Sequence, residues 1–248
     1  MPNVSYCVDL NEVHFNKYTP QPETRIVATF NVTDTSNPTN IVGYDERSGE
    51  YFTSPFSEIE IDGVLQNEVI GYYQFDTEGE HIVKYTLDDN TLVPQRTFFN
   101  TYNLTTISIP SGVTSIGNNA FYNCIGLHSV SLPNTLVELG NNTFIGCTSL
   151  LSVTIPDSVT TMGNSFQSCT GLTSITIPSG VTSMLNTFQN CTGLTSITCL
   201  PITPPTIDSF SFSGSDCPIY VPAESVSAYQ SASDWSTYAS RIQAIPTA

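Results

Sequence analysis

The sequence predicts a mainly β protein in which short, similar coils stack into a solenoid behind an N-terminal β domain. One apolar phrase recurs at a nearly constant spacing through the second half of the chain, and a phenylalanine marks each recurrence. Stretches that alternate apolar and polar residues, which are typical of β-strands, fill much of the first half. A fixed period of roughly 20–50 residues is the signature of repeat architectures, so the recurrence decides the fold class.

The N-terminal part, residues 1–90, is predicted to be a β domain. In residues 24–32 every second side chain is apolar, which indicates a strand with one buried face. Further strands are predicted at residues 57–61, 69–75 and 81–85. The pattern favours an immunoglobulin-like β-sandwich or partial sandwich. Almost no linker precedes the first repeat, so we expect the two parts to pack together.

The repeats occupy residues 91–222 as about five copies of 22–23 residues. The segment LTSITIP at residues 172–178 shows the phrase: alternation points isoleucine inward and Ser or Thr outward, and the proline ends the strand. The phenylalanines assigned to successive coils are Phe98, Phe121, Phe144, Phe166, Phe188 and Phe210. This pattern predicts a leucine-rich-repeat solenoid.

Cysteine follows four of these phenylalanines by three residues, at Cys124, Cys147, Cys169 and Cys191. Equivalent positions in adjacent coils lie ~4.8 Å apart, within disulfide range, but parallel side chains disfavour the bond geometry. We expect reduced thiols that fill the core. No CxxC motif or Cys/His pair suggests a metal. Whether Cys7, Cys199 and Cys217 form a disulfide stays open.

Residues 223–248 are predicted to form a short helical cap over the last coil, because a repeat array needs covered ends. The repeat decays through the proline-rich residues 201–205 and reappears at residues 219–222. Pro222, followed by Ala and Glu, is typical of a helix start. Trp235, Tyr238 and Ile242 supply apolar bulk, and a final strand is expected at residues 241–246.

Composition argues against several classes of partner. The net charge is −16, and six Lys and Arg residues cannot neutralise many phosphates, so neither nucleic acid nor an anionic membrane surface is expected. No apolar run approaches the ~18 residues of a membrane span. The N-terminus has no basic start and no apolar stretch, so no signal peptide is predicted. Either an export signal was trimmed or the chain reaches its destination without one.

No catalytic, cofactor-binding or metal-ligating residues are predicted. His14, His81 and His128 lie in different segments without partners at a motif spacing. His81 is expected in a strand, and His128 near the strand surface, where contact with a ligand is the less favoured alternative. The acidic residues of 76–80 and 88–89 do not match a calcium loop and are interpreted as solvated turns.

The candidate binding surface is the outward strand face of the repeats, expected to be the concave one. It is a neutral row of hydroxyls without the Trp, Tyr and Arg that dominate binding hot spots, so a merely solvated surface is the main alternative. Binding would then lie on the convex loops or the acidic N-terminal part. The predicted outward residues are Thr106, Ser108, Ser129, Ser131, Ser152, Thr154, Ser174, Thr176, Ser196 and Thr198.

The segment at residues 172–184, with Phe188, Cys191 and Leu194, resembles the BspA-type leucine-rich repeats of gut and oral bacteria. Residues 219–242 and 58–85 are similar to the segments that flank such arrays. The resemblance covers roughly residues 57–248. It implies an extracellular, surface-displayed protein that adheres to host proteins, matrix or other cells, with no shared catalytic residues.

Three hypotheses for function follow. The first is a non-enzymatic cell-surface adhesin that binds a host protein, matrix component or glycan. The second is a phage virion or attachment protein, prompted by the Met1 start without an export signal. The third is a passive spacer module of a larger surface assembly, prompted by the uniform Ser/Thr exterior. No cofactor is expected, and the ligand and the oligomeric state stay open.

Overall fold

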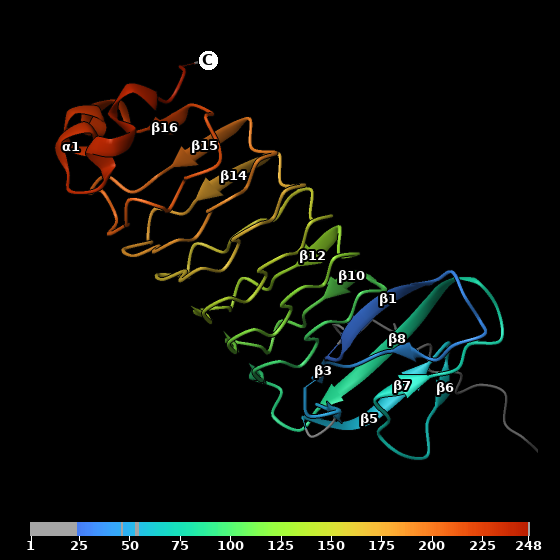
Figure 1. Ribbon diagram of the computed structural model, residues 1–248. Coiled ribbons are helices and arrows are strands. Elements are labelled where there is room, and N and C mark those ends of the chain that lie inside the picture. Colours follow the sequence, from blue (N-terminus) through green and yellow to red (C-terminus); the bar gives the residue numbers. More distant parts are fainter. Residues whose placement is uncertain (1–23, 46, 53–54, 248) are drawn as a thin grey trace, which may run out of the picture.

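The computed structural model describes residues 24–45, 47–52 and 55–247. The fold is mainly β, as predicted, and the described residues include one α-helix and two short 3₁₀-helices. Figure 1 shows a sheet-rich N-terminal end, a stack of coils, and a helical C-terminal end. The coils therefore separate two structurally different ends of an elongated molecule.

One six-stranded sheet joins the N-terminal part to the first two coils, in the order β12-β10-β1-β8-β5-β6. The central strand β1 is antiparallel to both of its neighbours, β8 and β10, whereas β10 and β12 are parallel. The two parts therefore share one hydrogen-bonded sheet, whereas the sequence predicted only that they pack against each other. The strands are β1 (Ile26–Val32), β5 (Phe56–Ile61), β6 (Val64–Leu65), β8 (Gly79–Leu87), β10 (Leu104–Ser108) and β12 (Ser129–Ser131).

The buried face of this sheet is explained by the alternation of side chains along β1, in which Ile26, Ala28 and Phe30 are fully buried. Loops next to one of two small sheets contribute Ile41 and Phe75 to the same core. The N-terminal part of the described chain thus contributes to one extended sheet and forms two short ones, and the immunoglobulin-like sandwich stays a prediction. The short strands are β2 (Thr39–Asn40) with β7 (Tyr72–Tyr73), and β3 (Tyr44–Asp45) with β4 (Glu50–Tyr51).

The coils stack in register through short parallel strands on two sides. On one side, β14, β15, β16 and β17 form a four-stranded sheet, and on another side β9, β11 and β13 form a three-stranded sheet. The bounds are β9 (Leu92–Val93), β11 (Ser115–Ile116), β13 (Glu138–Leu139), β14 (Ser174–Ile177), β15 (Ser196–Cys199), β16 (Ile219–Val221) and β17 (Ile242–Ala244). The predicted final strand is therefore present as β17.

A column of phenylalanine rings runs through the centre of the stack. Adjacent rings lie 5.1–6.0 Å apart between centroids and are tilted by 10° or less. Phe212, not the predicted Phe210, provides the sixth ring, and Phe210 is 57% exposed. The prediction was wrong because the proline-rich coil is longer, which places Phe212 24 positions after Phe188.

The C-terminal segment covers the last ring of this column. It consists of η1 (Ala223–Ser225), α1 (Val226–Ser231) and η2 (Trp235–Arg241), followed by β17. Trp235 and Tyr238 are buried against Phe212 at centroid distances of 5.4 and 5.3 Å. The indole Nε1 of Trp235 donates to the carbonyl of Pro205 at 2.7 Å. Polar atoms of the cap thus bind carbonyls that the irregular fifth coil leaves without a strand partner.

Each coil turns at residues with left-handed backbone, which asparagine and glycine tolerate best. One such position directly precedes the core cysteine in four coils and precedes Thr101 and Ser215 at the two ends of the array, and its residue has a φ of +57° to +87° in each case. The residues at this position are Asn100, Asn123, Gly146, Ser168, Asn190 and Gly214. Ser168 is the only one of them that is neither Asn nor Gly.

Candidate strand-face binding site

The structure brings the ten predicted outward residues onto one face of the stack. Thr106 lies opposite Ser129, Ser174 opposite Ser196, and Thr176 opposite Thr198. All ten side chains are exposed or partly exposed. The row contains no charged group, as the sequence indicated. Whether it binds a partner is a separate question from its position.

The row is not flat, because the third coil departs from the repeat. Its phrase at residues 150–156 resembles that of its neighbours, yet only Ser152 forms a bridge, to Ser129, and no strand is present there. Strands β12 and β14 therefore belong to different sheets. A hollow of about 360 Å³ lies at this break, lined by Ser152, Thr154, Asp157, Ser174, Thr176 and Leu200 among others.

This hollow combines hydroxyl groups with apolar and acidic side chains at its border. Leu200 is 37% exposed, and Leu151, next to the lining Ser152, is 55% exposed. Asp157 supplies a carboxylate. The hollow thus gives the face a depression of mixed polarity, whereas the sequence predicted only a flat row of hydroxyl groups.

Two residues of this face were missed by sequence reasoning. Tyr220 lies opposite Thr198, and Gln243 lies opposite Tyr220, so the row continues onto β16 and β17. The Tyr220 side chain is partly exposed. Since the repeat phrase reappears at residues 219–222, the same alternation rule places Tyr220 outward. The face therefore does carry one aromatic residue of the kind that favours binding.

The described histidines do not form a catalytic arrangement with a nucleophile. His81 is buried, with Nδ1 2.7 Å from the Asp62 carboxylate and Nε2 2.9 Å from the carbonyl oxygen of Thr77. These contacts hold the loops next to β8 in place. The His81 ring also packs on Phe75, with 4.2 Å between the ring centroids. His128 is exposed beside the first two coils. His14 and Cys7 lie outside the described residues.

The core cysteines are buried thiols rather than ligands. Burial raises the pKa of Cys191 to about 12 and the pKa of Cys169 well above its usual value. Each thiol of the ladder donates to the carbonyl of a phenylalanine 25 or 26 residues earlier, as from Cys124 to Phe98 at 3.0 Å. Cys199 and Cys217 are also free and buried. Within the described ranges, no three His, Cys, Asp or Glu side chains are grouped to hold a metal.

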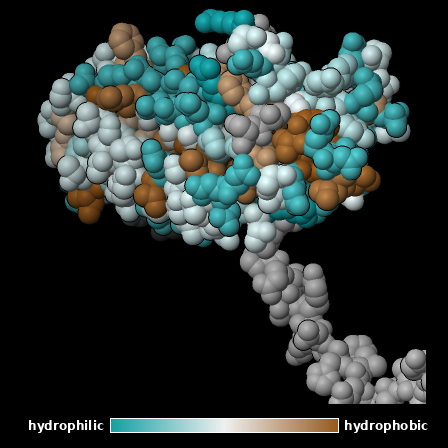
Figure 2. Space-filling model, turned by 90° about the horizontal axis from the view of Figure 1, so that it is seen from below, coloured by the Kyte–Doolittle hydropathy of each residue, from teal (hydrophilic) through white to brown (hydrophobic). Residues whose placement is uncertain are grey.

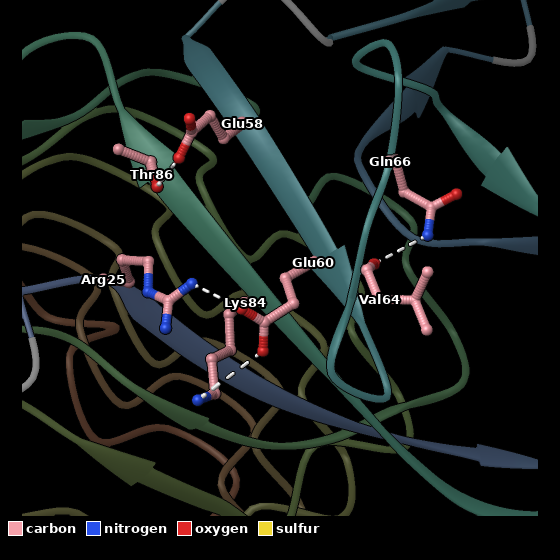
Figure 3. Close-up of polar contacts among 7 residues, drawn as sticks. All are labelled: Arg25, Glu58, Glu60, Val64, Gln66, Lys84 and Thr86. Atoms are coloured by element: carbon pink, nitrogen blue, oxygen red, sulfur yellow. Dashed lines mark hydrogen bonds and ion pairs between the residues drawn. The ribbon is translucent and has the colours of Figure 1, made fainter. Parts of the chain in front are cut away.

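Part of the acidity of the N-terminal sheet is neutralised by ion pairs on its outer face. Glu60 lies 2.8 Å from Arg25 and 3.7 Å from Lys84, and Thr86 donates to Glu58 at 3.4 Å (Figure 3). In the predicted acidic turns, Asp89 accepts hydrogen bonds from the hydroxyl and the backbone of Thr91, which lower the pKa of its carboxyl. Asp89 thus acts within its own turn, whereas Glu58 and Glu60 link β5 to neighbouring segments.

Exposed apolar side chains are distributed over the surface instead of forming one belt. Seen from below, they occur as separate patches among polar residues (Figure 2). They include Val64 and Leu65 at the edge strand β6 and Ile202 in the proline-rich coil. None of the described helices is long and apolar enough to cross a membrane.

Comparison with known proteins adds a family and several structural neighbours. Residues 91–219 match the model of the BspA type leucine rich repeat region, in six copies. A leucine rich cell surface protein from Faecalibacterium prausnitzii is 35% identical, over 57% of this chain and 38% of its own, with a TM-score of 0.50. A leucine rich repeat protein of T. pallidum is 31% identical, over 45% and 53% of the two chains, with a TM-score of 0.44.

A leucine-rich repeat protein from Bacteroides ovatus is 24% identical, over 59% of this chain and 45% of its own, with a TM-score of 0.43. No curated protein sequence matches the chain. The matched part of the chain thus spans about half or less of the length of these three solved structures.

Proposed function

The chain belongs to the BspA-type leucine-rich repeat family, whose model matches residues 91–219, just over half of its 248 residues, and we propose that it is a surface adhesin that binds its partner through the strand face. The family is a cell-surface, protein-interaction family without a catalytic activity. The partner we propose is a host or cell-surface protein, a matrix component or a glycan.

The observation that carries this proposal is the hollow at the third coil. A row of short hydroxyl side chains gains little from contact with a partner, because it offers no large apolar group to bury. The hollow adds the exposed edge of Leu200, a carboxylate at Asp157, and a depression into which a partner's side chain fits. Tyr220 extends the same face.

The proposal includes the architecture that presents this face. We propose that residues 91–222 form a leucine-rich-repeat solenoid, closed by the β domain of residues 1–90 and by a helical cap at residues 223–248. Pairing of β1 with β10 supports the first closure, and packing of Trp235 on Phe212 supports the second.

A double substitution on the face tests the proposed function. Thr154→Arg with Thr176→Arg places two long, charged side chains in the hollow, and both threonines are exposed. We expect saturable binding to immobilised collagen, laminin or a glycan panel, and at least a tenfold loss of affinity in the variant.

Thr160→Arg with Thr182→Arg is the matched control, because it changes exposed threonines of the same two coils on another side. Equal loss in both variants would indicate a general charge effect. Absence of saturable binding to intact host cells and to the panel would favour the spacer, and finding the chain in purified phage particles would favour the virion protein.

A further inference from the structure

A second concave region lies where the N-terminal sheet meets the first coils. One hollow of about 550 Å³ is lined by Asn31, Glu80, Thr105, His128 and Ser149 among others. A smaller hollow of about 160 Å³ is lined by Asn40 and Asn100 among others. Both are also lined by Tyr102 and Asn103, so the two hollows adjoin and form one groove, here called the junction groove.

The change of strand direction builds this groove. Strand β1 runs against β10, and β10 runs with β12, so the end of β1 and the start of β8 meet the starts of the two coil strands (Figure 1). The register between β1 and β10 shifts at Thr29/Phe30, where Thr106 and Leu104 are paired and Thr105 between them is not. Bulges of this kind redirect side chains, and Thr105 lines the groove.

Backbone hydrogen bonds hold the segments of the groove in place. Asn31 N donates to Asn103 O at 3.0 Å, and His128 N donates to Thr105 O at 3.0 Å. Glu80 lies opposite Asn31 in the β1–β8 pair. Because the groove is assembled from three fixed segments, a ligand does not have to order a loop, which lowers the cost of binding.

The chemistry of the lining is that of a site for a polyhydroxylated ligand. Amides and a carboxylate can donate to and accept from adjacent hydroxyl groups, and Asn31, Asn103, Asn40 and Glu80 provide them. Tyr102 is 37% exposed as a residue and lines both hollows, and its ring offers an aromatic surface for the C–H face of a sugar ring. A volume of 550 Å³ is in the range of small-ligand sites, about 300–1,000 Å³.

The charge of the groove selects among glycans. None of the described residues that line the two hollows is Lys or Arg, and the chain carries a net charge of −16. A sulfated or sialylated glycan would be repelled, whereas a neutral one would not. An extended peptide fits less well, because β1 is paired on both edges and offers no free strand edge to a main chain.

We propose that the junction groove binds a neutral oligosaccharide, with a sugar ring on Tyr102 and its hydroxyls bound by Glu80, Asn31, Asn103 and His128. The site is distinct from the strand face at the third coil, and it narrows the glycan of the proposed function to a neutral oligosaccharide that binds elsewhere on the molecule. It can therefore be present even if the strand face binds nothing.

The test uses the full chain on an array of neutral, sialylated and sulfated oligosaccharides, followed by calorimetric titration of the best neutral hit. We expect Tyr102→Ala to weaken binding at least tenfold, Glu80→Gln to weaken it severalfold, and Tyr102→Phe to retain most of it. Phe210→Ala, which removes an exposed ring in the fifth coil, is the matched control and is expected to bind as the unchanged chain does.

Circular dichroism of each variant distinguishes loss of binding from loss of fold. Retained binding by Tyr102→Phe would be a second sign that a substitution at this position leaves the fold intact. Binding of no neutral oligosaccharide, preference for charged glycans, or equal binding by Tyr102→Ala and Phe210→Ala would each overturn the proposal. The pair Thr154→Arg and Thr176→Arg is expected to leave this binding unchanged, so failure at the strand face and failure at the junction groove are distinguishable.

Discussion

At the scale of single residues, the cysteine ladder shows why a small thiol recurs in the core. Cys147 donates to the carbonyl of Phe121 at 3.2 Å, and Cys169 donates to that of Phe144 at 3.1 Å. An alanine would fill only part of the same volume and a valine would exceed it, and either would leave this carbonyl with one bond fewer. The sequence predicted reduced cysteines in the core, but not these bonds, because a period identifies equivalent positions and not the atoms that face them.

The buried thiols are expected to resist modification. Burial raises the pKa of the ladder cysteines, so at pH 8 very little reactive thiolate is present and reagents have no access to it. In a Cys7→Ser background we expect negligible reaction of the native chain with a thiol reagent, and reaction of all six remaining cysteines in guanidinium chloride. Rapid labelling of the native chain, or fewer than six thiols after unfolding without reductant, would contradict the burial or the free state.

Ser168 is expected to be a point of avoidable strain. It holds a φ of +60° at the position where the other coils carry Asn or Gly. Asparagine tolerates this conformation better, so Ser168→Asn should raise the free energy of unfolding by about 0.5–1 kcal/mol. Urea denaturation measures the change, and Ser179→Asn, at an exposed site in the next coil without such a φ, should leave stability unchanged. A lower free energy of unfolding for Ser168→Asn would show that the interactions of the Ser168 hydroxyl outweigh the relief of backbone strain.

At the scale of elements, local pattern and long-range pairing differ in what they reveal. The alternation of residues 26–32 identifies β1, because a strand with one buried face needs only its own residues. Its position between β8 and β10 depends on partners 47 or more residues away, for which no local pattern exists. The phrase of the third coil is the opposite case, since it predicts a strand at residues 150–156 but only Ser152 forms a bridge there.

The central place of β1 predicts an unequal response to proline. Val27 lies opposite Lys84 in β8 and Ser108 in β10, and a proline there removes a backbone donor between two partners. We expect Val27→Pro to lower the free energy of unfolding by about 3 kcal/mol or more in urea denaturation. Leu65→Pro is the control, because β6 is an edge strand and Leu65 is 58% exposed. Similar losses in both would mean that β1 does not join the two parts.

At the scale of the whole molecule, the phenylalanine column links every coil to both ends. Phe98 contacts Tyr85 of the N-terminal sheet at a centroid distance of 5.3 Å, and Phe212 contacts Trp235 of the cap at 5.4 Å. Nearest-neighbour packing of this kind makes repeats unfold together when each interface is strong. The recurrence of Phe assigned one ring to each coil but did not predict that the rings stack, and the shift from Phe210 to Phe212 shows that a period fails where a coil changes length.

The sole tryptophan makes this coupling measurable. Trp235 reports on the C-terminal end, whereas far-ultraviolet circular dichroism reports on all strands. We expect both to give the same midpoint in urea, as in a two-state transition. A lower midpoint for Trp235 fluorescence would show that the cap separates from the stack before the coils unfold.

Because the coils stack in register, the length of the array can change by whole coils. Inner coils contact only coils like themselves, while the two ends are specialised by β1 and by Trp235. Duplicating one coil of 22 residues inside the array would push the junction groove and the cap apart by about 4.8 Å, the spacing of neighbouring strands, and would leave both unchanged. The number of coils therefore sets the distance between the junction groove and the C-terminal segment, and this distance can change in steps of one coil without altering either end.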